Sequence, residues 1–412
     1  MSAPATTGRL LGVDAARGLA VLGMCLVHVH PTTGPTWLLD LAQGRSAALF
    51  AVLAGVSLAL LSGGTHPPAD LTTTRRRIGV RAAILLVLGL TLATLGTSVM
   101  VILCYYALYF LLCLPLLRLR APALAALAAA TAVAGPVASF AIRSHMEINE
   151  FGGSPSWLSV GDAGGALTML LLTGAYPALT WTPFVLAGMA LGRRGAGTTP
   201  PIRLVTAGAA LVAAGFGGSW FVQTVLGGRE RLVAVLEPIL AGSGLSAEQM
   251  LSAPSFGTAT TTSWWNLTLA NAHSGTPFEI IGSIGVALVV LGGLTALSER
   301  RWGRLALRPL IATGTMALTV YCLHIVILAV LPPMRFEGEE AITLGGMSLW
   351  TYFVLLIAAL VVFALAWTRR MRRGPLETLV HRATLLIRPR PSAPADDGDA
   401  APTVRRAGAG GP

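Results

Sequence analysis

Charged residues are scarce in this sequence, and lysine is absent. Only 11% of the 412 residues are charged, and all 29 strongly basic residues are arginine. The mean hydropathy is +0.70. A soluble domain usually carries about a quarter charged residues. These values therefore exclude an ordinary soluble domain and predict a polytopic membrane protein.

Cysteine is also rare, which limits the kinds of site that the chain can build. The four cysteines all lie inside apolar runs, and no two of them form a CxxC pair: Cys25, Cys104, Cys113 and Cys322. This pattern excludes a disulfide framework and a cysteine metal site. No histidine pair has a metal-ligand spacing such as HExxH. We therefore expect neither a bound metal nor a tightly bound cofactor.

The net charge of +11 raises the question of nucleic-acid binding. The arginines cluster at the ends of apolar runs, where basic residues set the orientation of membrane spans. We therefore expect the lipid bilayer as a partner and no nucleic acid. The lack of lysine, with abundant alanine, glycine and arginine, indicates a high-GC bacterial source. This predicts a multi-pass protein of the bacterial plasma membrane.

Apolar runs of about 20 residues, the length that crosses a bilayer as a helix, recur along the chain. We predict an all-α polytopic bundle with ten spans, at residues 12–30, 46–63, 79–97, 99–117, 122–142, 171–192, 203–226, 277–297, 309–331 and 349–368. Residues 163–176 are apolar as well. They form either a re-entrant segment or an additional span, so eleven spans is the rival count.

The distribution of arginine between alternate loops predicts the orientation. With a cytoplasmic N-terminus, the inner loops hold seventeen arginines: Arg75, Arg76, Arg77, Arg81, Arg118, Arg120, Arg193, Arg194, Arg203, Arg300, Arg301, Arg304, Arg308, Arg369, Arg370, Arg372 and Arg373. The outer loops hold five, namely Arg45, Arg143, Arg229, Arg231 and Arg335. This asymmetry selects ten spans with both termini in the cytoplasm.

The ends of the chain differ from the apolar body in composition. No small-x-small cleavage site follows the first apolar run, so we expect that run to be a retained span and not a signal peptide. We predict disordered residues 1–8, a membrane domain over 9–387, and a disordered tail over 389–412 that is rich in Pro, Ala, Gly and Asp. Residues 374–388 are amphipathic and are expected to lie on the inner membrane surface.

Four ionisable residues fall in the first predicted span. Arg17 and His28 are eleven residues apart, so both lie on one helix face, separated by about 16 Å along the axis. Asp14 is one turn before Arg17 and can pair with it. One interpretation is a local ion pair and a packed histidine. The other is that Arg17 binds an anion and His28 is functional, as intramembrane ionisable residues often are.

Two further polar groups lie far along the chain at the same predicted depth as His28. Tyr321 and His324 are one turn apart in the ninth predicted span. His273, Ser274 and Glu279 lie where the chain enters the eighth span from the outer side. A histidine near a carboxylate or a hydroxyl group is suited to proton transfer, because its pKa is near neutral. We therefore expect these groups to meet near His28.

Several segments together resemble a known group of membrane enzymes. The stretch RLLGVDAARGLAVLGMCLVH resembles the opening of the transmembrane acyltransferase superfamily, which includes the acyltransferase-3 proteins and the catalytic domain of heparan-alpha-glucosaminide N-acetyltransferase. The segments GTMALTVYCLHI and RRGPLETLVHR, with HSGTPFEIIGSIG before them, are similar to the DUF418 family. The resemblance covers roughly residues 9–387 and depends on the order of these motifs.

The resemblance implies ten or eleven spans and an acyl-CoA donor used across the membrane. Arg17 and His28 match the arginine and histidine that are implicated in acyl transfer in the acyltransferase-3 branch. The lysosomal acetyltransferase branch has asparagine at the position of His28 and its catalytic histidine in the following loop. That loop here contains Asp40 and Arg45 but no histidine.

These observations lead to the hypothesis of an acyltransferase. It would move an acyl group, such as acetyl, from a cytosolic acyl-CoA to a hydroxyl or amine of a small molecule or glycan at the outer face. We predict His28, His324 and Tyr321 as catalytic residues, Arg17 and Asp14 at the donor, and His273, Glu279 and Ser274 at the acceptor. A proton-coupled transporter and a non-enzymatic membrane scaffold are the alternatives, and a homodimer stays open.

Overall fold

The computed structural model describes residues 10–31, 35–146, 152–337 and 340–387. The predicted disordered segments 1–8 and 389–412 lie outside these residues. The first half of the described chain contains α1 (Leu11–Val29), α2 (Trp37–Ala42), α3 (Arg45–Leu61), α4 (Thr72–Thr94), α5 (Leu103–Leu112), η1 (Leu114–Arg118), α6 (Ala121–His145), η2 (Trp157–Ser159), α7 (Ala163–Thr168), η3 (Met169–Thr173) and α8 (Ala178–Arg194).

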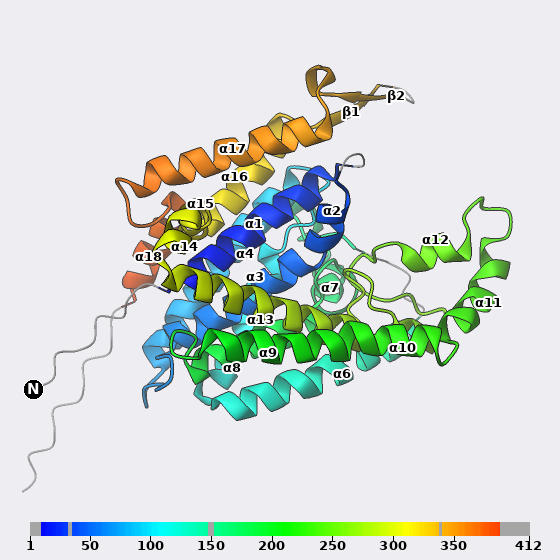
Figure 1. Ribbon diagram of the computed structural model, residues 1–412, viewed down its shortest axis with the longest axis horizontal. Coiled ribbons are helices and arrows are strands. Elements are labelled where there is room, and N and C mark those ends of the chain that lie inside the picture. Colours follow the sequence, from blue (N-terminus) through cyan, green and yellow to red (C-terminus); the bar gives the residue numbers. More distant parts are fainter. Residues whose placement is uncertain (1–9, 32–34, 147–151, 338–339, 388–412) are drawn as a thin grey trace, which may run out of the picture.

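The second half is also mainly helical. It contains α9 (Pro201–Val212), η4 (Ala213–Gly217), α10 (Gly218–Thr224), α11 (Gly228–Leu240), α12 (Ala247–Ser252), η5 (Trp264–Thr268), α13 (Pro277–Glu299), α14 (Arg301–Ala306), α15 (Arg308–Thr315), α16 (Ala317–Val330), β1 (Met334–Glu337), β2 (Glu340–Thr343), η6 (Leu344–Gly346), α17 (Leu349–Thr368) and α18 (Pro375–Leu385). Figure 1 shows the long helices running side by side along the longest axis of the molecule.

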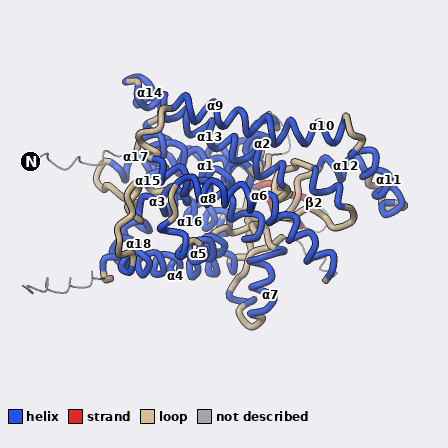
Figure 2. The backbone as a smooth tube through the Cα atoms, turned by 90° about the horizontal axis from the view of Figure 1, so that it is seen from below, coloured by secondary structure: helices blue, strands red, loops and turns tan. Residues whose placement is uncertain are grey.

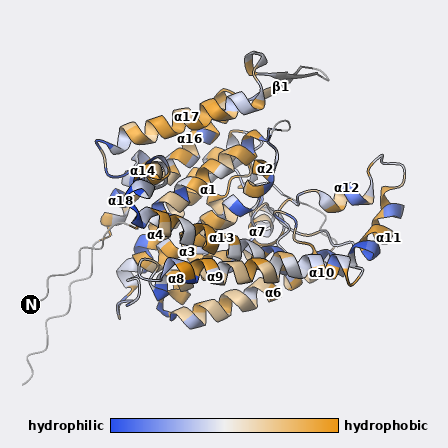
Figure 3. Cartoon of the chain, viewed as in Figure 1, coloured by the Kyte–Doolittle hydropathy of each residue, from blue (hydrophilic) through white to orange (hydrophobic). Residues whose placement is uncertain are grey.

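The structure supports a multi-pass membrane protein. Seven helices in the described ranges are long and apolar enough to cross a membrane, and two bent helix pairs raise the number to nine if each pair is one span. These helices are mainly apolar in Figure 3, as expected where backbone polar groups must pair within the helix and side chains meet lipid. Nine of the ten predicted spans therefore correspond to these elements.

The fourth predicted span, residues 99–117, does not form a long helix. Gly96 ends the preceding turn with a positive φ of 69°. The next helix, α5, has only ten residues and is followed by the short η1, which has Pro115 in its first turn. A second departure from an all-α chain is the antiparallel hairpin of β1 and β2, in which Met334 pairs with Thr343.

Both bent pairs depart from the single straight helix that the hydropathy pattern predicts. Residues 163–173 form α7 and η3, which meet α8 at 58°, as a broken span or a re-entrant segment would. Figure 2 shows α7 projecting from the bundle. The predicted span 309–331 is divided at Met316 into α15 and α16, which are bent by 86°. The free N-terminus of α16 therefore lies inside the protein.

Glu377 of α18 satisfies this buried helix N-terminus. Its Oε1 accepts the backbone N–H groups of Leu318 (2.7 Å) and Thr319 (3.2 Å), and its Oε2 accepts the Thr319 hydroxyl (2.6 Å). A carboxylate is favoured here because the first N–H groups of a helix have no partner within it. Within the predicted amphipathic segment 374–388, Pro375–Leu385 form α18, which docks on α4 and α16.

Close helix packing depends on glycine at two crossings. A Cβ on Gly314 of α15 would lie 1.7 Å from the Asp14 carbonyl oxygen of α1. A Cβ on Gly55 of α3 would lie 2.0 Å from the Val185 carbonyl oxygen of α8. Small residues allow helix backbones to approach closely in membranes. Gly55 and Gly314 therefore allow these helix pairs to pack closely.

The segments that carry the arginine clusters gather at one end of the bundle, which we call the arginine end. It comprises residues 62–71, 118–120, 194–200, 300–308 and 369–375, and Figure 1 shows α14 and α18 there beside the start of α1. The opposite end, the histidine end, comprises residues 30–31, 35–44, 152–177 and 225–276. This separation is what the loop charges predict, and the cytoplasmic placement of the arginine end stays a prediction.

Candidate functional site

The structure brings His28 and His324 into direct contact. Nδ1 of His28 lies 2.9 Å from Nε2 of His324, and the two rings are parallel with their centroids 5.2 Å apart. These residues are 296 positions apart in the sequence and come from α1 and α16. His324 is fully buried, whereas His28 keeps some accessible surface. One ring must donate and the other accept, so the pair can hold and transfer a proton.

Tyr321 supports His324 from the same helix. Its ring meets the His324 ring edge to face at 5.1 Å, and its hydroxyl accepts the backbone N–H of Ile102 at 3.1 Å. Tyr321 is buried. The hydroxyl is therefore hydrogen-bonded to the backbone of the segment before α5. The ring packs against His324 and fixes its position. A catalytic role for Tyr321 stays a prediction.

His273 lies in the loop before α13 and interacts electrostatically with His28. Its ring stacks on Trp181 at 5.9 Å and meets Tyr176 edge to face at 5.6 Å. The residue has a φ of 59°, a left-handed conformation that histidine adopts more readily than most residues. Burial among these aromatic rings lowers the pKa of His273 to about 4. His273 is therefore held by Trp181 and Tyr176 at the same end of the bundle as the pair of His28 and His324.

The other two residues predicted at the acceptor side serve the start of α13. The Ser274 hydroxyl lies 3.2 Å from the Thr276 hydroxyl, and Thr276 caps the helix by accepting the backbone N–H of Glu279. Glu279 is buried, and its carboxylate accepts the hydroxyl of Ser283 at 3.0 Å. These contacts give Ser274 and Glu279 a position inside the protein, near His273. A role in acceptor binding stays a prediction.

The lowered pKa of His273 predicts an acid-sensitive fold. The folded protein keeps this ring neutral down to about pH 4, whereas the unfolded chain takes up its proton below its ordinary pKa of about 6.5. Stability is therefore fully present at neutral pH and falls by up to about 3 kcal/mol as the pH drops from about 6.5 to 4. Thermal unfolding in detergent across this range should show that His273→Asn flattens part of the decline.

The matched control for this prediction is His66→Asn, because His66 is exposed in the loop after α3. Asparagine also tolerates the positive φ of His273, so the variant tests the titration and not the backbone. An unchanged pH profile in His273→Asn would contradict the prediction.

Asp14 and Arg17 form the ion pair expected from their spacing, with Nη1 of Arg17 3.2 Å from the Asp14 carboxylate. Nη2 of Arg17 also donates to the Ser57 hydroxyl of α3 at 2.6 Å. Asp14 is buried and Arg17 is partly accessible. Arg17 interacts electrostatically with Arg81 of α4. The local ion pair is therefore confirmed, and Arg17 also belongs to a larger basic group.

Arg77, Arg81 and His381 line a small cavity at the arginine end. The cavity has a volume of about 160 Å³ and lies between α4 and α18, lined by Leu61, Thr74, Arg77, Ile78, Arg81, His381, Thr384 and Leu385. Partial burial lowers the pKa of His381, and the charges of Arg373, Arg81 and Arg77 lower it further. Positive charge concentrated around a cavity favours an anionic ligand. No local motif indicates that His381 lines a cavity, because Arg77 and Arg81 lie about 300 residues earlier in the chain.

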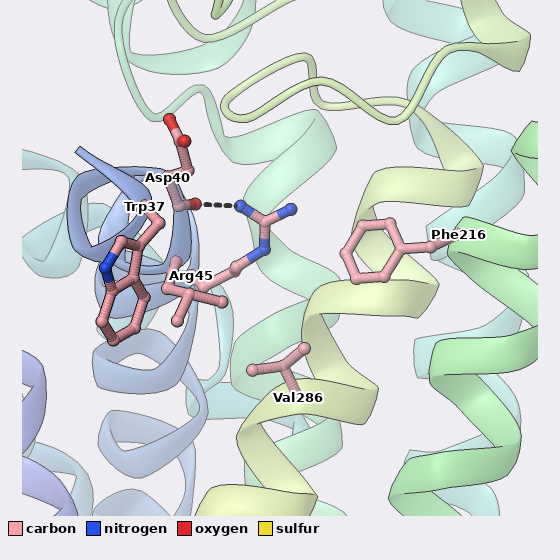
Figure 4. A pocket seen from close by; sticks show the side chains of 6 residues that line it. Trp37, Asp40, Arg45, Phe216 and Val286 are labelled. Atoms are coloured by element: carbon pink, nitrogen blue, oxygen red, sulfur yellow. Dashed lines mark hydrogen bonds between the residues drawn. The ribbon is translucent and has the colours of Figure 1, made fainter. Parts of the chain in front are cut away.

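A larger groove lies at the histidine end, between α2, α13 and η4. Its volume is about 560 Å³, and its lining comprises Trp37, Asp40, Leu41, Arg45, Phe216 and Val286. Figure 4 shows the guanidinium of Arg45 reaching into the groove toward Phe216. The Arg45 guanidinium carbon lies 5.1 Å from the centre of that ring. Arg45 was noted only as an outer arginine, since nothing local in the sequence indicates its contact with Phe216.

Neither cavity is lined by His28, and the structure describes no group of His, Cys, Asp and Glu that could hold a metal among the residues it covers. The two cavities lie at opposite ends of α1, with the His28 and His324 pair nearer to the larger groove.

Two family models match the chain. Residues 9–200 match the model described as heparan-alpha-glucosaminide N-acetyltransferase, catalytic, and residues 239–387 match the model described as protein of unknown function (DUF418). No curated protein matches the sequence. His28 lies in the first matched region and His324 in the second, so the histidine pair joins the two. The chain is thus a multi-pass helical membrane protein whose first part is similar to the heparan-alpha-glucosaminide N-acetyltransferase catalytic domain and whose last part is similar to DUF418.

Proposed function

We propose that the protein transfers an acyl group from an acyl-CoA to a hydroxyl or amine, with the reaction at His28. The observation that carries the proposal is the 2.9 Å contact between His28 and His324, two intramembrane histidines from the two matched regions. Ionisable residues inside a membrane are costly and usually serve function. A hydrogen-bonded histidine pair supplies the general base that acyl transfer needs.

In the proposed reaction, His324 engages Nδ1 of His28 and leaves Nε2 for the acceptor. Nε2 takes the proton of the acceptor hydroxyl or amine. At the same time the oxygen or nitrogen of that group attacks the carbonyl carbon of the thioester. The carbon–sulfur bond then breaks, and the protonated His28 returns the proton to the leaving thiolate. His324 stabilises the positive charge that forms on His28 by accepting a hydrogen bond from Nδ1.

The donor is proposed to enter from the arginine end. The cavity between α4 and α18 presents Arg77, Arg81 and His381, which suit the phosphate groups of coenzyme A. Arg17 interacts electrostatically with Arg81, which is one of these residues. The axial distance from Arg17 to His28 is about 16 Å, comparable with an extended pantetheine arm. The thioester would therefore reach His28 while the phosphates stay among the arginines.

The direct test measures thioester loss by the purified protein in detergent. Radiolabelled acetyl-CoA would be supplied with glucosamine as an amine-bearing sugar, and label in the sugar and on the protein would be followed. We expect thiol release that depends on the protein and on the acyl donor. No thioester loss from acetyl-, butyryl- or octanoyl-CoA, with and without the sugar, would overturn the proposal.

A further inference from the structure

The groove at the histidine end has the composition of a site for an amphipathic ligand. Its volume of about 560 Å³ is within the range of small-molecule pockets. Trp37 and Leu41 on its wall are 59% and 61% exposed, and both belong to the short α2, which begins the candidate membrane span Trp37–Leu61. Exposed apolar side chains on a bundle of membrane helices face lipid chains. The groove is therefore accessible to a ligand that arrives from the bilayer.

One cation, Arg45, projects into this mainly apolar groove. Its Nη1 donates to the backbone carbonyls of Asp40 (2.7 Å) and Gln43 (3.4 Å), and its guanidinium rests against Phe216. Within the described residues, Nε and Nη2 make no hydrogen bond. A guanidinium held in this way presents two parallel donors, the geometry that binds a phosphate or carboxylate. Arg45 is thus already oriented for an anion.

The surrounding charges restrict which anion fits. Asp40 lines the groove, and Figure 4 shows its carboxylate pointing away from the Arg45 guanidinium. Glu279 of α13 interacts electrostatically with Arg45 from inside the protein. Arg45 is the one cation among the described residues that line the groove, so a polyanion such as a nucleotide would lack charge partners. A singly charged phosphodiester matches the single cation.

The groove also adjoins the histidines. Gly44, next to Arg45, lies against the loop before α13, where its missing Cβ would be 3.1 Å from Ala272 and 3.3 Å from the backbone nitrogen of His273. His273 in turn interacts electrostatically with His28. A headgroup bound at Arg45 is therefore separated from the histidine pair by one loop.

We propose that this groove binds a phosphodiester lipid, with the phosphate on Arg45 and the hydrocarbon chain against Leu41, Phe216 and Val286. The site stands on its own as a lipid site. The role of this lipid rests on the proposed function: the acyl acceptor is a hydroxyl or amine carried by a lipid headgroup that enters laterally from the bilayer. A soluble sugar or metabolite would not need this groove.

The test uses brominated lipids, which quench nearby tryptophan fluorescence. The protein in maltoside micelles would be titrated with brominated phosphatidylglycerol or with brominated diacylglycerol, which lacks the phosphate. The difference between wild type and Trp37→Phe isolates the signal of Trp37. We expect half-maximal quenching of Trp37 at about tenfold lower concentration of phosphatidylglycerol, since a charge-assisted bidentate contact contributes that much to affinity.

Arg45→Gln should remove the preference for phosphatidylglycerol, and Arg45→Lys should restore only part of it because a lysine lacks the planar fork. Arg229→Gln is the control, because Arg229 lies at the same end but pairs with Glu248. Equal quenching by the two lipids, or an unchanged preference in Arg45→Gln, would overturn the proposal. So would displacement by glycerophosphoglycerol at similar concentration, which would indicate a soluble phosphodiester ligand.

Because no acyl donor is present, this binding assay is independent of catalysis. Lipid selectivity without any thioester loss would support the lipid site and contradict the proposed acyl transfer. Thioester loss without lipid selectivity would support acyl transfer and contradict the lipid site. If both hold, radiolabel from acetyl-CoA should appear in the phosphatidylglycerol fraction for wild type and fall about tenfold in Arg45→Gln, and a lipid fraction without label would overturn the lipid-borne acceptor.

Discussion

Replacement of His28 by glutamine is expected to lower the rate of acyl transfer by about 10²–10⁴-fold, the usual contribution of a general base. Glutamine can still form a hydrogen bond with His324 but cannot take up a proton at neutral pH. The affinity for acetyl-CoA should stay close to that of wild type, because the arginine end is unchanged. Steady-state rates of thiol release, measured over a range of pH, would report both kcat and KM.

His324→Gln should produce a loss of similar size in kcat and a shifted pH profile, since His324 positions His28 and stabilises its charge. The double variant should be little slower than either single variant, because residues that act as a unit give non-additive losses. His30→Gln is the matched control, as His30 follows α1 and is exposed. Wild-type kcat in His28→Gln would contradict the mechanism.

The second large effect is expected at Arg193, which is 5% exposed at the end of α8. Its Nη1 donates to the carbonyls of Ala59 (2.8 Å) and Gly64 (2.6 Å). Its Nη2 donates to the Ser62 hydroxyl at 2.7 Å and to the Leu117 carbonyl. One guanidinium therefore holds together the end of α3, the loop after it and η1.

Arg193→Met is expected to destabilise the fold by about 3 kcal/mol or more, because it leaves several buried carbonyls without a donor. Arg193→Lys should recover only part of the loss, since one ammonium cannot reach both sides of the cluster. Thermal unfolding of the purified protein in detergent would measure the change. Arg194→Met provides the comparison, because Arg194 is the exposed neighbour. Equal unfolding temperatures for the two methionine variants would contradict this role.

Much of the helical framework could be predicted from hydropathy, because a helix in lipid must be apolar over about 20 residues. The error at residues 99–117 has a physical reason. Gly96 and Pro115 bound a segment that is apolar because it is buried by protein, and hydropathy does not separate burial by protein from burial by lipid. The bend at Met316 was also missed, since the cap that permits it, Glu377, lies about 60 residues later.

The sequence also predicted part of the site. The depth of His28 and His324 indicated that they would meet, and the structure places their ring nitrogens 2.9 Å apart. His273 packs on Trp181 and Tyr176, and its approach to this pair stays a prediction. Ser274 contacts the residue that caps α13 and Glu279 accepts a buried hydrogen bond, and their role at an acceptor stays a prediction. Short-range spacing places a residue on a helix face, but the neighbouring element decides what that face meets.

The sequence by itself determined that this chain is a helical membrane protein, that its arginines separate toward one end, and that Asp14 pairs with Arg17. Each of these follows from local composition or from spacing along one helix. Only the tertiary structure decided that His28 shares a hydrogen bond with His324, that Glu377 caps α16, and that Arg45 faces Phe216 across a groove. These contacts join residues between about 60 and 300 positions apart, and their geometry depends on helix crossings that no local pattern encodes.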